Sequence, residues 1–182
     1  MKRWTRMLLL LFVLLSSVGC DQATKLAATH HLKQKPAVSF ASNFVRFQYA
    51  ENRGAFLSLG AHLPAQWRFW FFTVMTGAML FFLAFFLWRQ FPRLSWNLSL
   101  AFALVLGGGI GNFLDRVLNP GFVVDFVSVG VGVVRTGIFN VADVLIMAGV
   151  ALVGWEAFRL GTEKPEVVVD PMDNAFAVPW EE

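Results

Sequence analysis

Three stretches with almost no charge constrain the fold of this chain more than any other feature of its sequence. Residues 69–88 and 94–114 contain no charged side chain, and residues 136–155 contain one, Asp143. A helix rises about 1.5 Å per residue, so about 20 residues cross a hydrocarbon core about 30 Å thick. We therefore expect each stretch to be a membrane-spanning helix.

A further stretch, residues 7–28, is long enough to span but carries Asp21 and Lys25 near its far end. It has a rival interpretation, because bases followed by an apolar run ending at Cys20 approach the signal peptide and lipidation site of a bacterial lipoprotein. A soluble domain should follow in a lipoprotein, whereas three apolar stretches follow here. We therefore favour a first span.

The composition agrees with a membrane protein. Hydrophobic residues make up 57% of the 182 residues and charged residues only 15%, against roughly a quarter in soluble domains. This excludes a disordered chain and a coiled coil, and the single cysteine excludes an internal disulfide and a cysteine-rich metal site. The pI of about 9.4 does not indicate nucleic-acid binding, because no basic run is interleaved with stacking aromatics.

Basic residues predict the orientation of the spans. Three bases precede the first span, and Arg89 and Arg93 lie in the short turn between the second and third. Positively charged loops face the cytoplasm, so both termini should be cytoplasmic. Residues 29–66 and 115–135 should then lie outside.

We divide the chain into a four-span membrane domain, residues 1–161, and an acidic cytoplasmic tail, residues 162–182. The outer loop at about 37–60 should contain β structure, because residues 44–49 alternate like a strand, and residues 131–134 suggest a second short strand. The predicted fold class is an all-α integral membrane protein with four transmembrane helices and a small extracytoplasmic β region.

Polar residues that are unusual in a membrane protein gather, in this topology, at the outer face. Ionisable groups within a bilayer are costly and are usually functional. The set comprises Asp21, Lys25, Asn52, Gly54, Asn112, Asp115, Arg116, Asp125, Asn140 and Asp143.

Two of these carboxylates are the parts of an aspartic-protease dyad. Asp143 lies eight residues past Arg135, roughly 12 Å along a helix and so inside the hydrocarbon zone, and Asp125 lies in an apolar loop. Close carboxylates share one proton, so one can activate water while the other donates to the developing oxyanion. Spacing alone leaves open that Asp143 pairs with Arg116 or caps a helix.

Other residues and other functions remain open at this point. Asp115 is better explained as an ion pair or cap than as catalytic, and Asp21 with Lys25 could be a simple helix pair or could position the site. The glycine-rich residues 107–111 indicate close helix packing or room for a substrate. The alternative function is a small proton-coupled transporter that uses both carboxylates of the dyad, which would need polar groups down to the cytoplasmic side.

Five sequence blocks resemble the bacterial lipoprotein signal peptidases (signal peptidase II) and occur in the same order. They are DQATK at 21–25, ENRGAF at 51–56, GGIGNFLDR at 108–116, VVDF at 123–126 and FNVADVLI at 139–146.

The resemblance implies an aspartic endopeptidase that needs no metal or cofactor. We also expect a monomer in the bacterial inner membrane that binds no nucleic acid. It would act, among membrane lipid, on prolipoproteins that carry diacylglycerol on a cysteine, cutting just before that cysteine. The residues matching the family motifs would be catalytic (Asp125, Asp143), would position the substrate (Asn52, Gly54, Asn112, Arg116, Asn140) or would give structural support (Asp21, Lys25, Asp115). A lipidated substrate should enter sideways, beside the glycine stretch.

Overall fold

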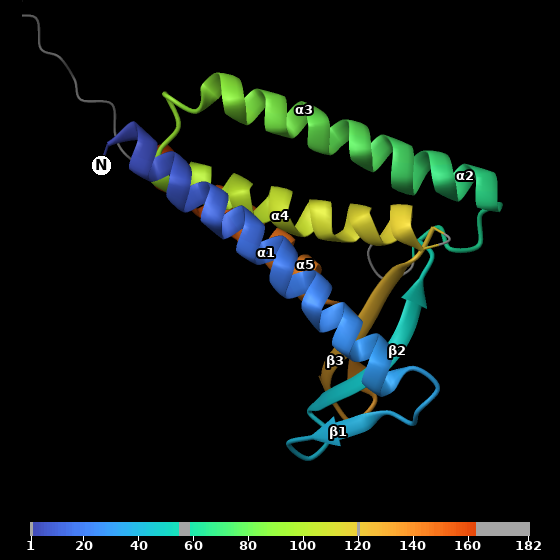
Figure 1. The fold of residues 1–182 in the computed structure, drawn as a ribbon. Helices are drawn as coiled ribbons and strands as arrows, with labels where there is room; N and C mark the ends of the chain where they lie inside the picture. The colour runs from blue at the N-terminus through green and yellow to red at the C-terminus, as the bar shows by residue number, and fades with distance from the viewer. Residues whose placement is uncertain (1, 55–58, 120, 163–182) are drawn as a thin grey trace, which may run out of the picture.

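Four long helical segments form the body of the molecule in the computed structural model, which describes residues 2–54, 59–119 and 121–162 (Figure 1). Within these residues four segments, of 30, 26, 23 and 22 residues, are long and apolar enough to cross a membrane. The predicted four-span fold is therefore confirmed. The segments are α1 (Arg3–Leu32), the continuous run α2 (Ala65–Phe69), η2 (Trp70–Val74) and α3 (Met75–Gln90), then α4 (Trp96–Leu118) and α5 (Val141–Thr162).

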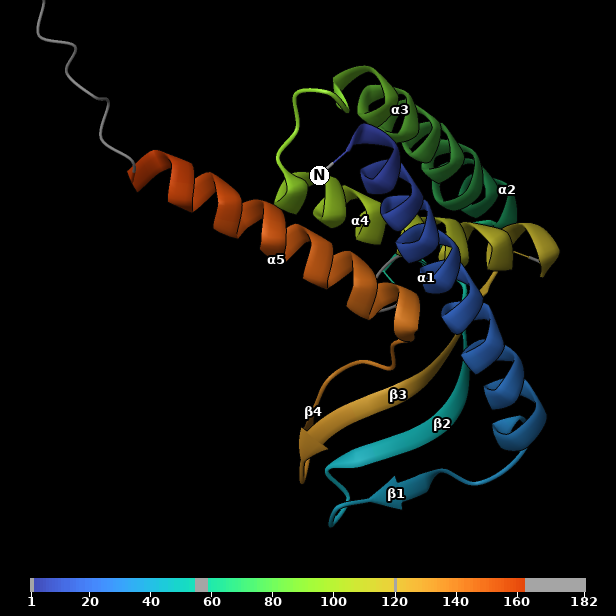
Figure 2. The same cartoon turned by 60° about the vertical axis from the view of Figure 1, so that its left-hand side comes forward.

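Helix α4 is the centre of the bundle, with α1, α3 and α5 arranged around it (Figures 1 and 2). Glycines allow the close approach. A Cβ on Gly107 would lie 2.6 Å from Ser17 Cβ of α1, and a Cβ on Gly149 would lie 2.6 Å from the Ala101 carbonyl oxygen. A Cβ on Gly108 would collide with the Ala142 carbonyl oxygen of α5. The glycine stretch therefore serves helix packing, and the substrate opening expected beside it remains a prediction.

The outer surfaces of the helices carry large apolar side chains. Phe81 and Phe82 on α3 are 67% and 66% exposed, and Phe12 on α1 is 69% exposed. In water this exposure would oppose folding, whereas lipid chains solvate it. The surface thus agrees with the spans in placing the bundle in a bilayer.

A four-stranded antiparallel sheet projects from one end of the bundle (Figure 2). Its strands, in spatial order, are β1 (Val38–Phe40), β2 (Val45–Asn52), β3 (Val123–Val131) and β4 (Val134–Arg135). Two expectations need correction. Asp125 lies in strand β3 and not in a loop. Residues 131–134 are not one strand, because Val131 ends β3, Gly132 with a positive φ of 58° turns the chain, and Val134 begins β4.

Strand β2 contains a one-residue bulge. Phe47 is opposite Val127, but Ala50 is opposite Asp125, so β2 uses one more residue than β3 over this interval. Beyond the bulge Asn52 is opposite Val123, on the same face as Asp125. Without the extra residue Glu51 would take this place, so the bulge decides which side chain meets Asp125.

Helix α5 begins at Val141, five residues later than the predicted 136. The preceding residues continue the pairing of the sheet: Thr136 N donates to the Val129 carbonyl oxygen, and Phe139 bridges Val127. Asp143 is therefore the third residue of the helix. The expectation that it lies roughly 12 Å along a helix from Arg135 is wrong.

Candidate active site

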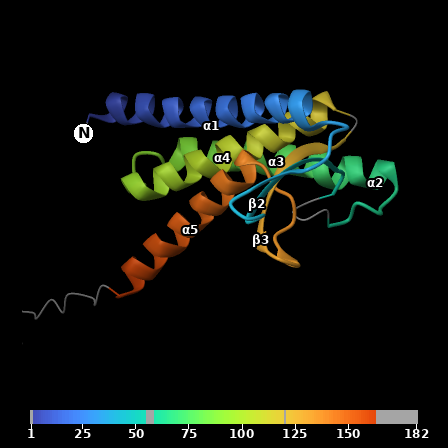
Figure 3. The same cartoon turned by 90° about the horizontal axis from the view of Figure 1, so that it is seen from below.

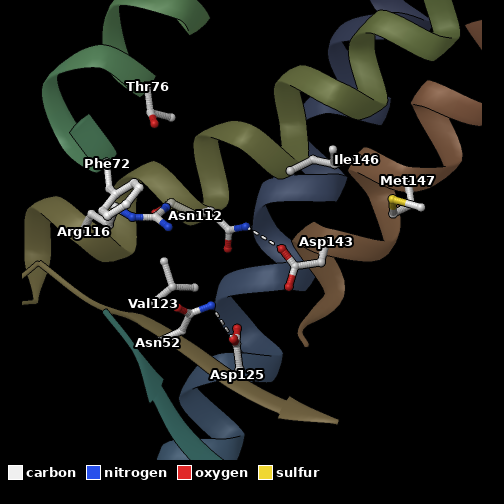
Figure 4. Close-up of a pocket in the computed structure, with 10 residues that line it drawn as sticks. All are labelled: Asn52, Phe72, Thr76, Asn112, Arg116, Val123, Asp125, Asp143, Ile146 and Met147. Carbon is white, nitrogen blue, oxygen red and sulfur yellow. Dashed lines mark hydrogen bonds between the residues drawn. The ribbon is translucent and has the colours of Figure 1, made fainter. Parts of the chain in front are cut away.

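A cavity of about 260 Å³ lies where the C-terminal end of α4 and the N-terminal end of α5 meet the sheet and the η2 turn (Figure 4). It is lined by Asn52, Phe72, Thr76, Asn112, Arg116, Val123, Asp125, Asp143, Ile146 and Met147. Both predicted carboxylates of the dyad are in this lining. They come from different elements, Asp125 from β3 and Asp143 from the first turn of α5.

Asp125 is almost fully buried, at 2% exposure, and two side-chain amides donate to it. Asn52 Nδ2 lies 2.9 Å from Oδ2 and Asn140 Nδ2 lies 2.7 Å from Oδ1. Asn52 can reach the carboxylate because it is the diagonal cross-strand neighbour that the β2 bulge provides.

Asp143 is held by the start of its own helix. Asn140 Oδ1 accepts from the Asp143 N–H at 3.0 Å, and Asp143 Oδ2 accepts from the Asn140 N–H at 3.2 Å. This reciprocal pair is a capping box. Of the two alternatives to catalysis, capping is therefore present, whereas no ion pair within 4.0 Å joins the described side chains of Asp143 and Arg116.

Two asparagines connect the carboxylates. Asn112 Nδ2 donates to Asp143 Oδ1 at 2.9 Å, and its Oδ1 accepts from Asn140 Nδ2 at 3.1 Å. Because Asn140 also donates to Asp125, a continuous path of side-chain hydrogen bonds runs between the two carboxylates. Each carboxylate oxygen of the pair accepts at least one hydrogen bond.

A buried charged cluster lies behind the asparagines. Lys25 Nζ is 2.8 Å from Asp21 Oδ2 and 3.3 Å from Asp115 Oδ2, and it donates to Asn112 Oδ1 at 2.9 Å. Asp21, Lys25 and Asp115 are each at most 4% exposed. The i,i+4 pair on α1 is therefore not a surface pair, because it reaches the hydrogen-bond path of the site.

The same cluster fixes the backbone of both elements that carry the dyad. Asp21 Oδ1 accepts from the Ala142 N–H at the start of α5 at 2.9 Å. Asp115 Oδ2 accepts from the Val124 N–H, next to Asp125, also at 2.9 Å. These contacts favour positioning by Asp21 and Asp115, as the sequence suggested for Asp115.

Arg116 also lines the cavity, and Gly54 holds it from behind. Arg116 donates to the Gly54 carbonyl oxygen at 2.9 Å and to the Asn112 carbonyl oxygen at 3.2 Å. The Gly54 N–H in turn donates to Asn52 Oδ1 at 3.0 Å. Arg116 Nε is buried and has no hydrogen-bond partner within the part of the chain that the structure describes.

The surroundings of Asp125 favour its protonated form. Burial, followed by the nearby charge of Asp143, raises the pKa of Asp125 from 3.8 to about 6, while the amides of Asn52 and Asn140 act in the opposite direction. A carboxylate with these surroundings retains a proton more readily than an exposed one. Asp125 is accordingly suited to hold the shared proton.

Two cavity residues on the second span were not predicted as site residues. Phe72 belongs to the π-helical turn η2, and Thr76 follows it in α3. Figure 4 shows them on the side of the cavity opposite the two carboxylates. Sequence reasoning does not single out these residues, because the span around them is apolar throughout. The sequence signal for this side of the cavity is Thr76, a polar residue in a span that has few polar groups.

Most predicted site residues thus line the cavity or contact a residue that does. Asp21 and Asp115 are one contact further away, since both pair with Lys25, which donates to Asn112 of the lining. In the described ranges 2–54, 59–119 and 121–162, no group of three or more His, Cys, Asp or Glu side chains is arranged to hold a metal ion.

The comparisons with known proteins identify the family. The model of signal peptidase (SPase) II matches residues 13–159. The chain belongs to the signal peptidase II family.

Individual members of the signal peptidase II family support this assignment. The lipoprotein signal peptidase of Shewanella woodyi is 34% identical over 151 residues, which cover 83% of this chain and 80% of that protein. That of Shewanella sp. MR-4 is 37% identical over 115 residues, or 63% of this chain and 66% of that protein, just under two thirds of its length. A solved bacterial membrane enzyme is 27% identical, with a TM-score of 0.73 over 88% of this chain and 94% of its own.

Membership of the signal peptidase II family makes the chain a membrane peptidase. It also decides against the alternative of a proton-coupled transporter. The interpretation of residues 1–20 as a cleaved lipoprotein signal is not favoured either, because α1 runs without interruption through Cys20 to the buried Asp21 and Lys25.

Proposed function

We propose that this protein is an aspartic endopeptidase that removes the signal peptide from diacylglyceryl-modified prolipoproteins, cutting before the lipid-carrying cysteine. The observation that carries the proposal is the pair Asp125 and Asp143, both lining one cavity and joined through Asn140 and Asn112. The family match supplies the substrate class, since the relatives are lipoprotein signal peptidases.

In the first step, a water between the carboxylates attacks the scissile carbonyl carbon. Asp143 takes a proton from the water, and protonated Asp125 gives its proton to the carbonyl oxygen, which yields a neutral tetrahedral diol. The raised pKa of Asp125 supports this assignment of acid and base.

In the second step, the carbon–nitrogen bond breaks. Asp143 returns its proton to the cysteine nitrogen as that nitrogen leaves, and Asp125 takes back a proton from the diol. The signal peptide then ends in a carboxylic acid, the lipoprotein begins with a free amine, and the dyad is restored. No metal or cofactor takes part in this scheme.

The remaining cavity residues would hold the peptide. Arg116 lines the cavity and would offer its guanidinium to a peptide carbonyl oxygen, and Phe72, Ile146 and Met147 give the cavity an apolar wall. We assign Asn52, Asn112 and Asn140 to orienting the dyad, and Gly54 to anchoring Arg116 and Asn52. Asp21, Lys25 and Asp115 would support this arrangement from behind.

The enzyme would lie in the bacterial inner membrane with its active site near the outer face and both termini in the cytoplasm. The first residues of α1 and the last residues of α5 lie at the same end of the bundle, away from the sheet (Figure 3). Arg3, Arg89 and Arg93 are at that end, which suits the cytoplasmic side. The acidic tail beyond residue 162 lies outside the described residues, and its cytoplasmic placement remains a prediction, as do the monomeric state and the absence of nucleic-acid binding.

The deciding experiment incubates the purified protein with a purified diacylglyceryl-prolipoprotein and measures both products by mass. We expect a single cut before the lipid-carrying cysteine. Cleavage at another bond, or no cleavage by well-folded protein, would contradict the proposed function.

A further inference from the structure

A second cavity, of about 290 Å³, lies at the opposite end of the bundle from the active site. We call it the arginine-end groove. Its walls come from α1, from the end of α3 and from α4, and Figure 2 shows the start of α1 beside the connection between α3 and α4. It is lined by Arg3, Met7, Leu10, Leu11, Leu14, Leu87, Trp88, Phe91, Leu94, Ser99, Ala103 and Leu106.

Arginines surround the mouth of the groove. Arg3 is itself in the lining. The Arg6 guanidinium lies 4.8 Å from the ring centre of Phe91 and donates to the Leu94 carbonyl oxygen at 2.7 Å. The Arg89 guanidinium lies 5.8 Å from the ring centre of Trp88. Each of the three cations therefore lines the groove or contacts a residue that does.

These cations are not neutralised by side chains of the described part of the chain. No carboxylate there lies within 4.0 Å of the guanidinium nitrogens of Arg3, Arg6 or Arg89. The nearby carboxylate of Glu156 instead accepts hydrogen bonds from Ser95 and Asn97, at 2.9 and 3.0 Å. The groove therefore combines an apolar interior with a positively charged mouth.

We propose that the arginine-end groove binds an anionic phospholipid, with one acyl chain along the apolar floor and the phosphate at the arginines. The charge at the mouth selects this occupant over the apolar helix of a signal peptide, because a signal peptide begins with basic residues that the arginines would repel. The proposal does not depend on the proposed peptidase function, because the groove shares no residue with the active-site cavity.

The test measures binding of dioleoyl phosphatidylglycerol and dioleoyl phosphatidylcholine to the purified full-length protein in one detergent, by native mass spectrometry and by thermal unfolding. The two lipids have the same chains, so their difference reports the head group. We expect phosphatidylglycerol to bind at least fivefold more tightly and to raise Tm, with an effect that falls as salt is added. Inorganic phosphate alone should not raise Tm, because it lacks the chain.

Matched variants locate the site. Arg3→Gln should weaken phosphatidylglycerol binding about fivefold, whereas Arg93→Gln, the same charge change at the same end but outside the lining, should weaken it much less. Leu11→Trp should fill the groove and reduce binding of both lipids. Leu8→Trp is its control, because Leu8 is on the same helix, is 66% exposed and is not in the lining.

Three results would overturn the proposal: equal binding of the two lipids, equal losses for Arg3→Gln and Arg93→Gln, or unchanged lipid binding by Leu11→Trp. Leu11 is 52% exposed, so its replacement does not disturb a packed core, and the circular dichroism of each variant checks its fold. Cleavage activity is not used as a readout, so a failure here is distinct from a failure of the proposed function.

Discussion

Asn140 and Asp143 exchange two hydrogen bonds across the first turn of α5. Asn140 also donates from its side-chain Nδ2 to Asp125 Oδ1 at 2.7 Å. One asparagine thus begins the helix, orients one carboxylate through the backbone and contacts the other directly. Capping and catalysis are not competing explanations of Asp143, because the cap is what fixes its position.

We predict that Asp125→Asn and Asp143→Asn each lower cleavage by about 10³-fold or more, because an amide cannot take the proton of the attacking water or supply the acid proton. Asparagine keeps the shape but replaces one of the two accepting oxygens by a donor, so the melting temperature and circular dichroism of each variant check that it is folded. Initial rates on a diacylglyceryl-prolipoprotein provide the measurement.

Glu51→Gln is the matched control for the dyad variants. Glu51 adjoins Asn52 but bonds Arg53 and lies on the other face of β2. It should keep near-normal activity. Ordinary turnover by either dyad variant would refute the catalytic assignment.

The pH dependence should follow the pKa of Asp125, which is about 6. Since Asp125 must hold a proton, kcat/KM should fall as pH rises through about 6. Folding stability should fall as pH rises from 3.8 to about 6, because over this range the folded protein keeps a proton on Asp125 that the unfolded chain has already released.

The variant Asn52→Ala tests whether Asp125, and not another titrating group, sets the pH dependence of kcat/KM. The Asn52 amide favours the charged form of Asp125, so its removal should raise that pKa and move the alkaline limb of kcat/KM to higher pH. A limb that stays in place, or moves to lower pH, would show that another group sets it.

Lys25→Met should destabilise the protein by about 3–5 kcal/mol, because Asp21 and Asp115 would remain buried without their cation. Lys33→Met is the comparison. Lys33 is 46% exposed, and its Nζ is as far as 3.8 Å from Glu51 Oε1. The loss of this weak surface pair should cost less than about 1 kcal/mol. Unfolding in detergent distinguishes the two, and similar small losses would mean that the cluster is not a support.

Gly108→Ala should cost about 1–3 kcal/mol, because the new Cβ meets the Ala142 carbonyl oxygen at the start of α5. Gly154→Ala on α5 meets nothing within 4 Å and should be neutral or stabilising. Melting temperatures measure both. If Gly108→Ala instead kept full stability and lost only activity on lipidated substrate, the result would support an opening at the glycines.

The diacylglyceryl group should be required for efficient cleavage. The cavity borders apolar residues of the spans, Ile146 and Met147, and two acyl chains would hold the scissile bond there. The comparison is one prolipoprotein with and without its diacylglyceryl group in the same detergent. Equal kcat/KM for both would refute this requirement while leaving the dyad untouched.

The spans and the site residues can be predicted from the sequence for different reasons. Bilayer thickness sets a length that charge-free stretches must match, so the four spans follow directly. The topology then collects Asp21, Asn112, Asp125 and Asn140 at one face, and the motif resemblance gives their expected roles.

Local pairing is what the sequence could not reveal. Helix α5 begins only at Val141 because Phe139 pairs with Val127, a residue 12 positions earlier in the chain. The β2 bulge depends equally on its partner strand, since Phe47–Asn52 carries no glycine to mark it. Phe72 and Thr76 join the site only because η2 turns them toward it.

The β2 bulge also has a consequence for how the molecule could be altered. It resets the phase of the strand, so the outer hairpin of β1 and β2 can be lengthened or exchanged upstream of Phe47 without changing which residue faces Asp125. Residues 50–52 have no such freedom, because one inserted residue there would place Glu51 beside the dyad and one deleted residue would place Arg53 there. The part of the hairpin before Phe47 can therefore be exchanged for another sequence, whereas the part of β2 after the bulge cannot change in length.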